Sequence, residues 1–301
     1  MLDQINGLHH VTTIGSDARA IDRFWTDTLG LRRVKKTVNF DAPDVYHLYY
    51  GDEMGRPGTA MTYFPFPNAG RGRRGAGEVA ETRLAIPEGA APFWADRLGT
   101  EIATDPFGAP VVRIAAPDGD AFALVESGDT RAPFTGAIDA DHAIRGFHSS
   151  APLVRDAAPM AELLRFMGYE ETAREGEVIR FTRPGGTANV IDLIERSDAP
   201  AAQQSAGSVH HIAFSVDDRT AQLAVQKALT EQGFAVTPQI DRDYFWAIYF
   251  RTPGGILFEV ATDEPGFASD ESPETLGQAL KLPRQHEHLR TQLERTLVPL
   301  D

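Results

Sequence analysis

The chain has 301 residues, with 29 Lys and Arg against 43 Asp and Glu for a formal net charge of −14, and it contains no Cys. The acidic balance argues against nucleic acid as the main partner, because phosphate binding needs clustered positive charge. The lack of Cys excludes disulfides, thiolate nucleophiles and Cys-ligated metals. No apolar run approaches the ~18 residues of a membrane helix, and the start, MLDQINGLHH, has no basic and then apolar leader. We therefore expect no membrane segment, no secretory signal and a cytoplasmic location.

Four short amphipathic helices are predicted along the chain, at residues 18–29, 91–98, 158–167 and 220–232. Each one ends at a glycine, which is the common residue just past a helix because it adopts positive φ without strain. These glycines recur at intervals of 69, 69 and 65 residues. Turns that begin at Pro57, Pro117, Pro184 and Pro253 recur at intervals of 60, 67 and 69 residues. Two independent markers in step indicate an internal repeat.

Strand-like sequence flanks each helix and each turn. Strands are predicted before the helices at 8–14, 82–86, 147–153 and 209–216, and after the turns at 59–64, 121–126, 187–195 and 256–261. Each unit then has the order βαβββ. We predict an α+β fold of four βαβββ modules, with an N-terminal pair in residues 1–135, a C-terminal pair in residues 140–301, and a final helix near 286–296. The alternative is an α+β protein whose turns happen to be regularly spaced.

Two His doublets, at residues 9–10 and 210–211, lie in the first predicted strands of modules one and four. Side chains alternate between the two faces of a strand. The second His of each doublet, His10 or His211, shares its face with small or hydroxyl side chains that leave room for a cavity. Strict alternation turns the first His of each doublet, His9 or His210, to the opposite, apolar face.

Glu259 lies in the middle of the apolar strand ILFEVA, where a carboxylate is costly unless it is exposed or paired with a cation. Together with His10 and His211 it forms a candidate 2-His-1-carboxylate set, which suits Fe(II) or Mn(II) and leaves open positions for substrate and O₂. The corresponding position of module one is near Thr62, and Asp192 of module three has no His partner. We therefore predict one metal per chain and adjacent modules one and four. The alternative is that each His is an ordinary strand residue and that Glu259 faces solvent.

Five sequence stretches are typical of a known family: GLHHVT at 7–12, the segment 46–67, RGFHS at 145–149, VHHIAF at 209–214 and the segment 241–267. In combination they resemble the vicinal oxygen chelate superfamily, which includes glyoxalases and extradiol dioxygenases. The closer resemblance, nearly end to end, is to the hydroquinone-type ring-cleaving dioxygenases. This resemblance implies that the four modules pair into two cup-shaped barrels.

The resemblance also implies roles for individual residues. The iron ligands of the family correspond to His10, His211 and Glu259. The further residues near the metal keep the family's residue types, and they correspond to His9, Thr12, His210, Arg242 and Tyr249.

The function implied is oxidative cleavage of a hydroquinone or related aromatic diol by Fe(II) and O₂. His9 or His210 would move protons, because imidazole has a suitable pKa, and Tyr249 or Arg242 would donate hydrogen bonds to a developing anion. Three aromatic residues are candidates for an apolar pocket: Tyr49, Phe64 and Trp246.

Two other functions stay open. A glyoxalase-like lyase or isomerase would use the metal as a Lewis acid without O₂, but such enzymes present more carboxylate ligands than this chain offers near Thr62. A non-catalytic protein that binds small aromatic compounds would not need an intact ligand set. The ring substituents of the substrate, the metal loaded and the oligomeric state, including a homo-oligomer, are not determined by the sequence.

Overall fold

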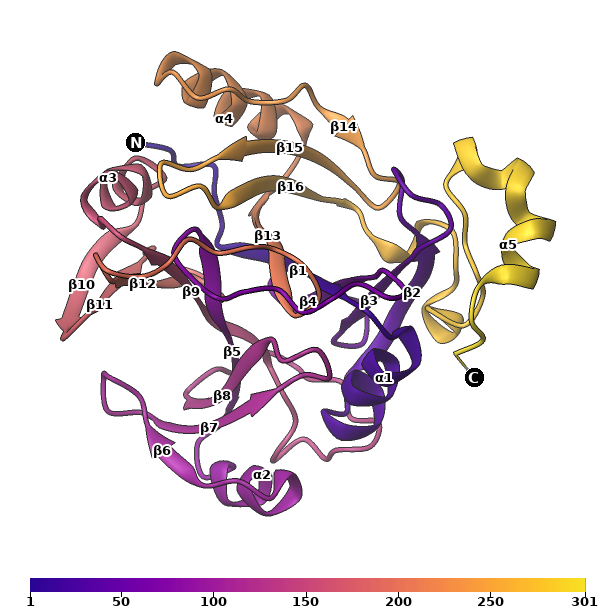
Figure 1. The fold of residues 1–301 in the computed structure, drawn as a ribbon, viewed down its shortest axis with the longest axis horizontal. Coiled ribbons are helices and arrows are strands. Elements are labelled where there is room, and N and C mark those ends of the chain that lie inside the picture. The colour runs from indigo at the N-terminus through magenta and orange to yellow at the C-terminus, as the bar shows by residue number, and fades with distance from the viewer. Residues whose placement is uncertain (301) are drawn as a thin grey trace.

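The computed structural model describes residues 1–300 and contains two eight-stranded sheets (Figure 1). The strand order is β14-β15-β16-β13-β1-β4-β3-β2 in the first sheet and β10-β11-β12-β9-β5-β8-β7-β6 in the second. Modules one and four thus share the first sheet, and modules two and three share the second. The predicted α+β fold of four βαβββ modules and the adjacency of modules one and four are confirmed.

The first sheet is built from two modules at opposite ends of the chain. Module one contains β1 (Leu8–Gly15), α1 (Ala18–Arg23), β2 (Arg32–Val38), β3 (Tyr46–Gly51) and β4 (Ala60–Pro65). Module four contains β13 (Ser208–Val216), α4 (Arg219–Glu231), β14 (Ile240–Asp241), β15 (Phe245–Arg251) and β16 (Leu257–Pro265).

The second sheet is built from the two central modules. Module two contains β5 (Glu78–Pro87), α2 (Ala91–Leu98), β6 (Ile102–Thr104), β7 (Pro110–Ala115) and β8 (Ala121–Ser127). Module three contains β9 (Gly146–Val154), α3 (Ala158–Phe166), β10 (Glu170–Glu175), β11 (Val178–Thr182) and β12 (Val190–Glu195).

The first strands of the modules meet at the centre of each sheet. β1 pairs with β13 and β5 pairs with β9, both antiparallel, whereas the first and last strands within a module are parallel neighbours. Each sheet therefore joins strands from both halves of the chain. The division into domains between residues 135 and 140 stays a prediction.

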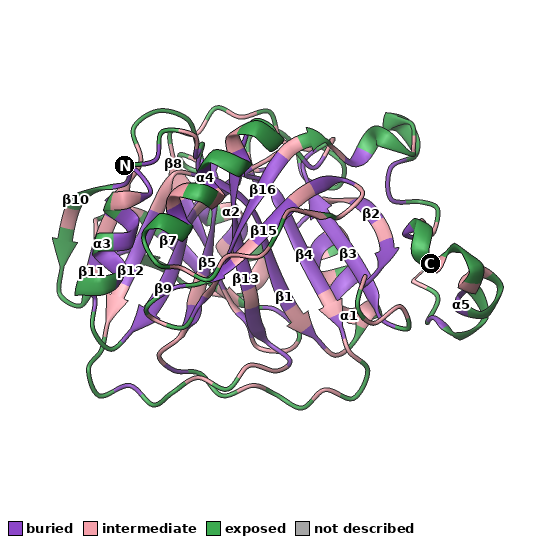
Figure 2. Ribbon diagram, turned by 90° about the horizontal axis from the view of Figure 1, so that it is seen from above, coloured by how far each residue is buried: buried purple, intermediate pink, exposed green. Residues whose placement is uncertain are grey.

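The module helices lie outside the sheets and bury one face each (Figures 1 and 2). Asp17 and Asp218 cap α1 and α4 by accepting hydrogen bonds from backbone N–H groups of the first turn. Large side chains from the helical segments, such as Trp25, Trp94 and Leu229, enter a common apolar core with the strands. This packing of an amphipathic helix on a sheet is what the 3.6-residue pattern predicts.

Two predicted helices differ in their ends. The helix expected over 18–29 is α-helical only to Arg23 and continues as a π-helix, η1 (Phe24–Thr28). The helix expected over 286–296 is divided into a 3₁₀ segment, η4 (Arg284–Leu289), and α5 (Arg290–Thr296). Two more short 3₁₀ segments, η2 (Phe267–Ser269) and η3 (Pro273–Thr275), precede them. No helix within residues 1–300 has the length and apolar character that a bilayer crossing requires.

Candidate metal centre

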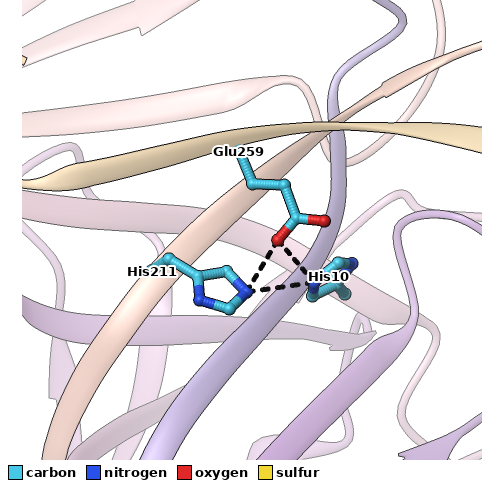
Figure 3. A group of neighbouring side chains, drawn as sticks. All are labelled: His10, His211 and Glu259. Atoms are coloured by element: carbon cyan, nitrogen blue, oxygen red, sulfur yellow. Dashed lines mark hydrogen bonds and ion pairs between the residues drawn. The ribbon is translucent and has the colours of Figure 1, made fainter. Parts of the chain in front are cut away.

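The three predicted ligands lie on adjacent strands in the middle of the first sheet. His10 is on β1, His211 on β13 and Glu259 on β16 (Figure 3). Nε2 of His211 lies 2.9 Å from Oε2 of Glu259, Nε2 of His10 lies 3.4 Å from the same oxygen, and the two nitrogens are 3.3 Å apart. Three ligand atoms within 4.8 Å of one another could bind a metal ion.

The electrostatics of Glu259 fit a cation at this point. Its side chain is fully buried, and among residues 1–300 neither carboxylate oxygen receives a hydrogen bond of good geometry. Burial opposes ionisation, but the imidazoles of His10 and His211 hold the pKa of Glu259 well below its usual range. A buried, ionised carboxylate that accepts no hydrogen bond of good geometry is costly unless a cation neutralises it. The donor set, two imidazoles and one carboxylate, suits a divalent transition metal.

A β-bulge changes the orientation of His9. Leu8 pairs with Phe214 and His10 pairs with Ala213, so β1 has one extra residue, His9, between these two pairs. A bulge interrupts the alternation of side chains and redirects the extra residue. The His9 ring therefore contacts the His10 ring instead of pointing to the opposite face.

A second bulge does the same for His210. Thr12 pairs with His211 and Thr13 pairs with Val209, which leaves His210 as the extra residue of β13. The expectation from strict alternation, that His9 and His210 face the apolar side, is wrong for this physical reason.

The two histidines at the bulges contact the rings of the two candidate ligand histidines through their Nδ1 atoms. Nδ1 of His9 lies 2.9 Å from Nδ1 of His10, and Nδ1 of His210 lies 2.7 Å from Nδ1 of His211. If the ligand ring donates from Nδ1, its Nε2 lone pair is free for a metal, which is the usual arrangement around metal-bound histidines. Burial, together with the neighbouring His10 or His211, lowers the pKa of both His9 and His210 to about 3.

Arg242 and Tyr249 stand beside Glu259. Nε of Arg242 donates to the Tyr249 hydroxyl oxygen over 3.3 Å, and Nη1 of Arg242 lies 3.8 Å from a carboxylate oxygen of Asp41. Burial and the negative charge of Glu259 raise the pKa of Tyr249 far above its ordinary value. Tyr249 therefore keeps its proton and can donate a hydrogen bond to an acceptor.

These residues open onto a cavity of about 330 Å³. Aromatic rings form much of its wall, which also includes the candidate metal ligands, His210, Arg242 and Tyr249. The remaining lining residues are Asn39, Phe40, Asp41, Ala42, His47, Tyr49, Phe64, Phe66, Phe245 and Leu257.

Among the cavity-lining side chains that the sequence did not single out are His47 and Phe245. His47 shares a strand face with Tyr49, so the alternation in YHLYY was the available signal. Phe64 and Tyr49 line the cavity as expected. Trp246 instead lies beneath the guanidinium of Arg219, 3.7 Å from the ring centroid, and is absent from the cavity lining formed by residues 1–300.

The sequence is similar to those of known proteins. The sequence pattern of the Glyoxalase/Bleomycin resistance protein/Dioxygenase superfamily matches residues 86–260. The chain is 42% identical over 310 residues to the "Putative ring-cleaving dioxygenase MhqO" of Bacillus subtilis, covering 100% of this chain and 98% of that protein. It is 36% identical over 312 residues to the chlorohydroquinone/hydroquinone 1,2-dioxygenase of Sphingobium indicum, covering 98% and 97%.

Solved structures show the same fold. The crystal structure of a "putative dioxygenase" from Bacillus subtilis superimposes with a TM-score of 0.95 at 42% identity, covering 99% of this chain and 98% of that chain. Glyoxalase I from Zea mays superimposes with a TM-score of 0.63 at 13% identity, covering 86% and 92%, which shows a shared fold alone. The chain therefore belongs to the Glyoxalase/Bleomycin resistance protein/Dioxygenase superfamily, and full-length relatives within it are named as ring-cleaving dioxygenases.

Proposed function

We propose that the protein is a ring-cleaving dioxygenase that uses Fe(II) and O₂ to open a hydroquinone or related aromatic diol. One observation carries the proposal: two imidazole nitrogens and one buried carboxylate that receives no hydrogen bond of good geometry from residues 1–300 converge in the wall of an aromatic-lined cavity. The name of one full-length relative supports the ring-cleaving reaction and that of the other supports the substrate class.

His10, His211 and Glu259 would hold the metal. Bound there, Fe(II) supplies open coordination positions for a phenolic oxygen and O₂ and the electron transfer that couples them. The aromatic walls around it would bind the flat ring of the substrate and exclude water, which strengthens the polar contacts at the reacting end.

The residues beside the ligands would handle protons and charge. Because the pKa of His9 and of His210 is about 3, both rings are neutral near pH 7. With His211 donating to its Nδ1, His210 would carry its own proton on Nε2 and could donate a hydrogen bond to an oxygen in the cavity that it lines. Tyr249 stays protonated and would donate a hydrogen bond to an anionic oxygen of the substrate. Arg242 fixes the Tyr249 hydroxyl by donating to its oxygen.

The strand register favours an oxygenase over a glyoxalase-like lyase. Tyr249 pairs with Glu259 across β15 and β16, and Tyr49 pairs with Thr62 across β3 and β4. Thr62 thus occupies the position that corresponds to Glu259 in module one. With a threonine there, the centre has one carboxylate ligand and keeps coordination positions open.

An anaerobic experiment tests the proposal. Protein is loaded with Fe(II) or, in parallel, Mn(II), mixed with hydroquinone, and then exposed to O₂. We expect stoichiometric O₂ uptake and a ring-opened product. Binding of hydroquinone without O₂ uptake would contradict the dioxygenase function, and turnover without O₂ would indicate the lyase or isomerase.

A matched pair of variants tests the ligand assignment. His211→Ala should lose the metal and the O₂ uptake, whereas His148→Ala, at the corresponding bulge of the second sheet, should keep both. A cytoplasmic location, which we propose together with this function, is one in which Fe(II) stays reduced.

A further inference from the structure

A row of hydrogen bonds runs along one wall of the cavity. The Tyr49 hydroxyl lies 2.8 Å from Nδ1 of His47, Nε2 of His47 lies 3.0 Å from the Thr62 hydroxyl, and the Thr62 hydroxyl lies 2.8 Å from that of Thr12. Tyr49 and His47 line the cavity, and all four side chains are buried. The row connects β3, β4 and β1.

The direction of this row follows from its closed end. Thr12 is 0% exposed, and Thr62 is the one hydrogen-bond partner of its hydroxyl among residues 1–300. If Thr12 did not donate to Thr62, its hydroxyl proton would be buried without an acceptor, at a cost of about 1–3 kcal/mol. The Tyr49 hydroxyl at the other end of the row borders the cavity, where solvent or a ligand can accept its proton. Thr12 therefore donates to Thr62.

The donor and acceptor roles of each following group are then determined. The Thr62 hydroxyl, having accepted from Thr12, donates to Nε2 of His47, so the neutral imidazole carries its proton on Nδ1. That Nδ1–H donates to the Tyr49 oxygen. The hydroxyl proton of Tyr49 has no acceptor left in the row and is available to a ligand in the cavity.

Tyr49 lines the same cavity as the candidate metal ligands, so its hydroxyl can reach a ligand bound there. Burial and then the charge of Glu259 raise the pKa of Tyr49 well above its ordinary value, so its proton stays in place. Its strand position corresponds to that of Tyr249, because the two tyrosines pair with Thr62 and Glu259 in the same register. Arg242 donates to the oxygen of Tyr249 as His47 does to that of Tyr49.

We propose that Tyr49 is a second hydrogen-bond donor to the phenolic oxygen of a bound aromatic ligand. His47, Thr62 and Thr12 are positioning residues that keep this hydroxyl turned to donate. The inference rests on the proposed function for the class of ligand, an aromatic ring that carries an oxygen.

Binding of 4-nitrophenol to the metal-loaded protein, kept free of O₂, tests the inference without any turnover. At a pH where the probe is a phenolate, Tyr49→Phe should weaken its binding about 10-fold, because a hydrogen bond to a charged oxygen is lost. The absorption maximum of the bound phenolate should also shift relative to the wild type. Thr12→Val, which keeps the shape of the side chain, should weaken binding less, about 3-fold.

Two controls separate hydrogen bonding from packing. Nitrobenzene keeps the ring and the nitro group but lacks the phenolic oxygen, so it should bind the wild type and Tyr49→Phe equally. Tyr169→Phe removes a buried hydroxyl that has no partner among residues 1–300, and it should leave 4-nitrophenol binding unchanged. Three outcomes would overturn the inference. Tyr49→Phe could lose affinity for both probes equally, it could bind 4-nitrophenol as tightly as the wild type, or the wild type could fail to bind 4-nitrophenol.

Nitrogen-15 NMR of the protein examines the row directly. His47, assigned through the His47→Gln variant, should show its proton on Nδ1, and a proton on Nε2 would refute the direction derived above. The outcome is separate from that of the proposed function. Tyr49-dependent binding of 4-nitrophenol by a protein that takes up no O₂ with hydroquinone would refute the dioxygenase and leave this inference standing.

Discussion

At corresponding positions, the first sheet holds Glu259 beside two histidines and the second holds Asp192 beside two arginines. Glu259 pairs with Tyr249, and Asp192 pairs with Arg180 in the same register. Both carboxylates are fully buried. The two sheets thus share a buried negative charge and differ in what neutralises it.

In the second sheet the neutralising charge belongs to the chain. Nη1 of Arg83 lies 2.6 Å from Asp192, and Arg180 donates to both carboxylate oxygens over 2.7 and 2.8 Å. Arg83 pairs with Ser149, just as Thr12 pairs with His211 in the first sheet. Where the guanidinium groups are replaced by neutral side chains, the carboxylate is left for a cation from outside. The comparison teaches that one fold can satisfy the same buried charge internally or leave it open as a binding site.

The sharpest way to break this comparison is to remove the carboxylate from each sheet in turn. Glu259→Gln should abolish stoichiometric metal binding, because the charged ligand is lost and two neutral imidazoles remain. Asp192→Asn should keep one metal per folded chain. Metal analysis of the purified variants is the measurement, and a Glu259→Gln protein that retained its metal would show that the ion lies elsewhere.

The next largest effect is expected at Arg83. Arg83→Ala leaves the buried carboxylate of Asp192 with less neutralising charge, so we expect the free energy of unfolding to fall by about 3–5 kcal/mol. Arg83→Lys keeps the charge and should cost less. Urea unfolding of both variants measures the difference. A loss below ~1 kcal/mol in Arg83→Ala would mean that Arg180 alone suffices.

His148, the bulged histidine of the second sheet, predicts a pH dependence of stability. Burial, together with the positive charges of Arg180 and Arg83, lowers the pKa of His148 to about 4. Below the usual pKa of histidine the unfolded chain takes up a proton that the folded chain refuses until about pH 4, so the free energy of unfolding falls as the pH drops from about 6.5 to 4. In His148→Gln the free energy of unfolding should decrease less over this pH range than in the wild type, by on the order of 2 kcal/mol.

The measurement is urea unfolding of metal-free wild type and His148→Gln at pH 7 and pH 4.5. An equal pH dependence in the two proteins would show that His148 takes up its proton over the same pH range in the folded and the unfolded chain, and would contradict the prediction.

The smallest effect is expected at the rim of the same cluster. Arg113 corresponds to Tyr49 by register, its side chain is 43% exposed, and it lies 3.3 Å from Glu81. Solvent screens such a pair, so Arg113→Ala should change the free energy of unfolding by less than ~1 kcal/mol. A larger loss, measured by urea unfolding beside Arg83→Ala, would place the rim and the buried pair in one cooperative network.

The repeat and the four modules could be predicted because each module repeats the same local signals. The adjacency of modules one and four could be predicted because a single candidate ligand set is divided between them. Strand alternation also predicted that His10, His211 and Glu259 share a face, and the structure brings them together. Their role as metal ligands stays a proposal.

Other parts of the site depend on tertiary structure that alternation does not encode. His9 and His210 turn toward the ligands only because each is the extra residue of a bulge, and a bulge depends on the partner strand. His47 becomes important through Thr62, which lies on a different strand. Prediction from the sequence fails in this way wherever the orientation of a side chain depends on a neighbour that is distant in sequence.

The central pairing of β1 with β13 has a consequence for the order in which the protein is made. Two of the candidate ligands, His10 and His211, are separated by 201 positions along the chain, and Glu259 is synthesised later still. Nearly the whole polypeptide must therefore be synthesised before these three side chains can come together. Until then β1 lacks its neighbour β13. Binding of a metal at this centre would therefore follow the synthesis of β16, and a chain that ended before β16 would contain both histidines but lack the carboxylate of Glu259.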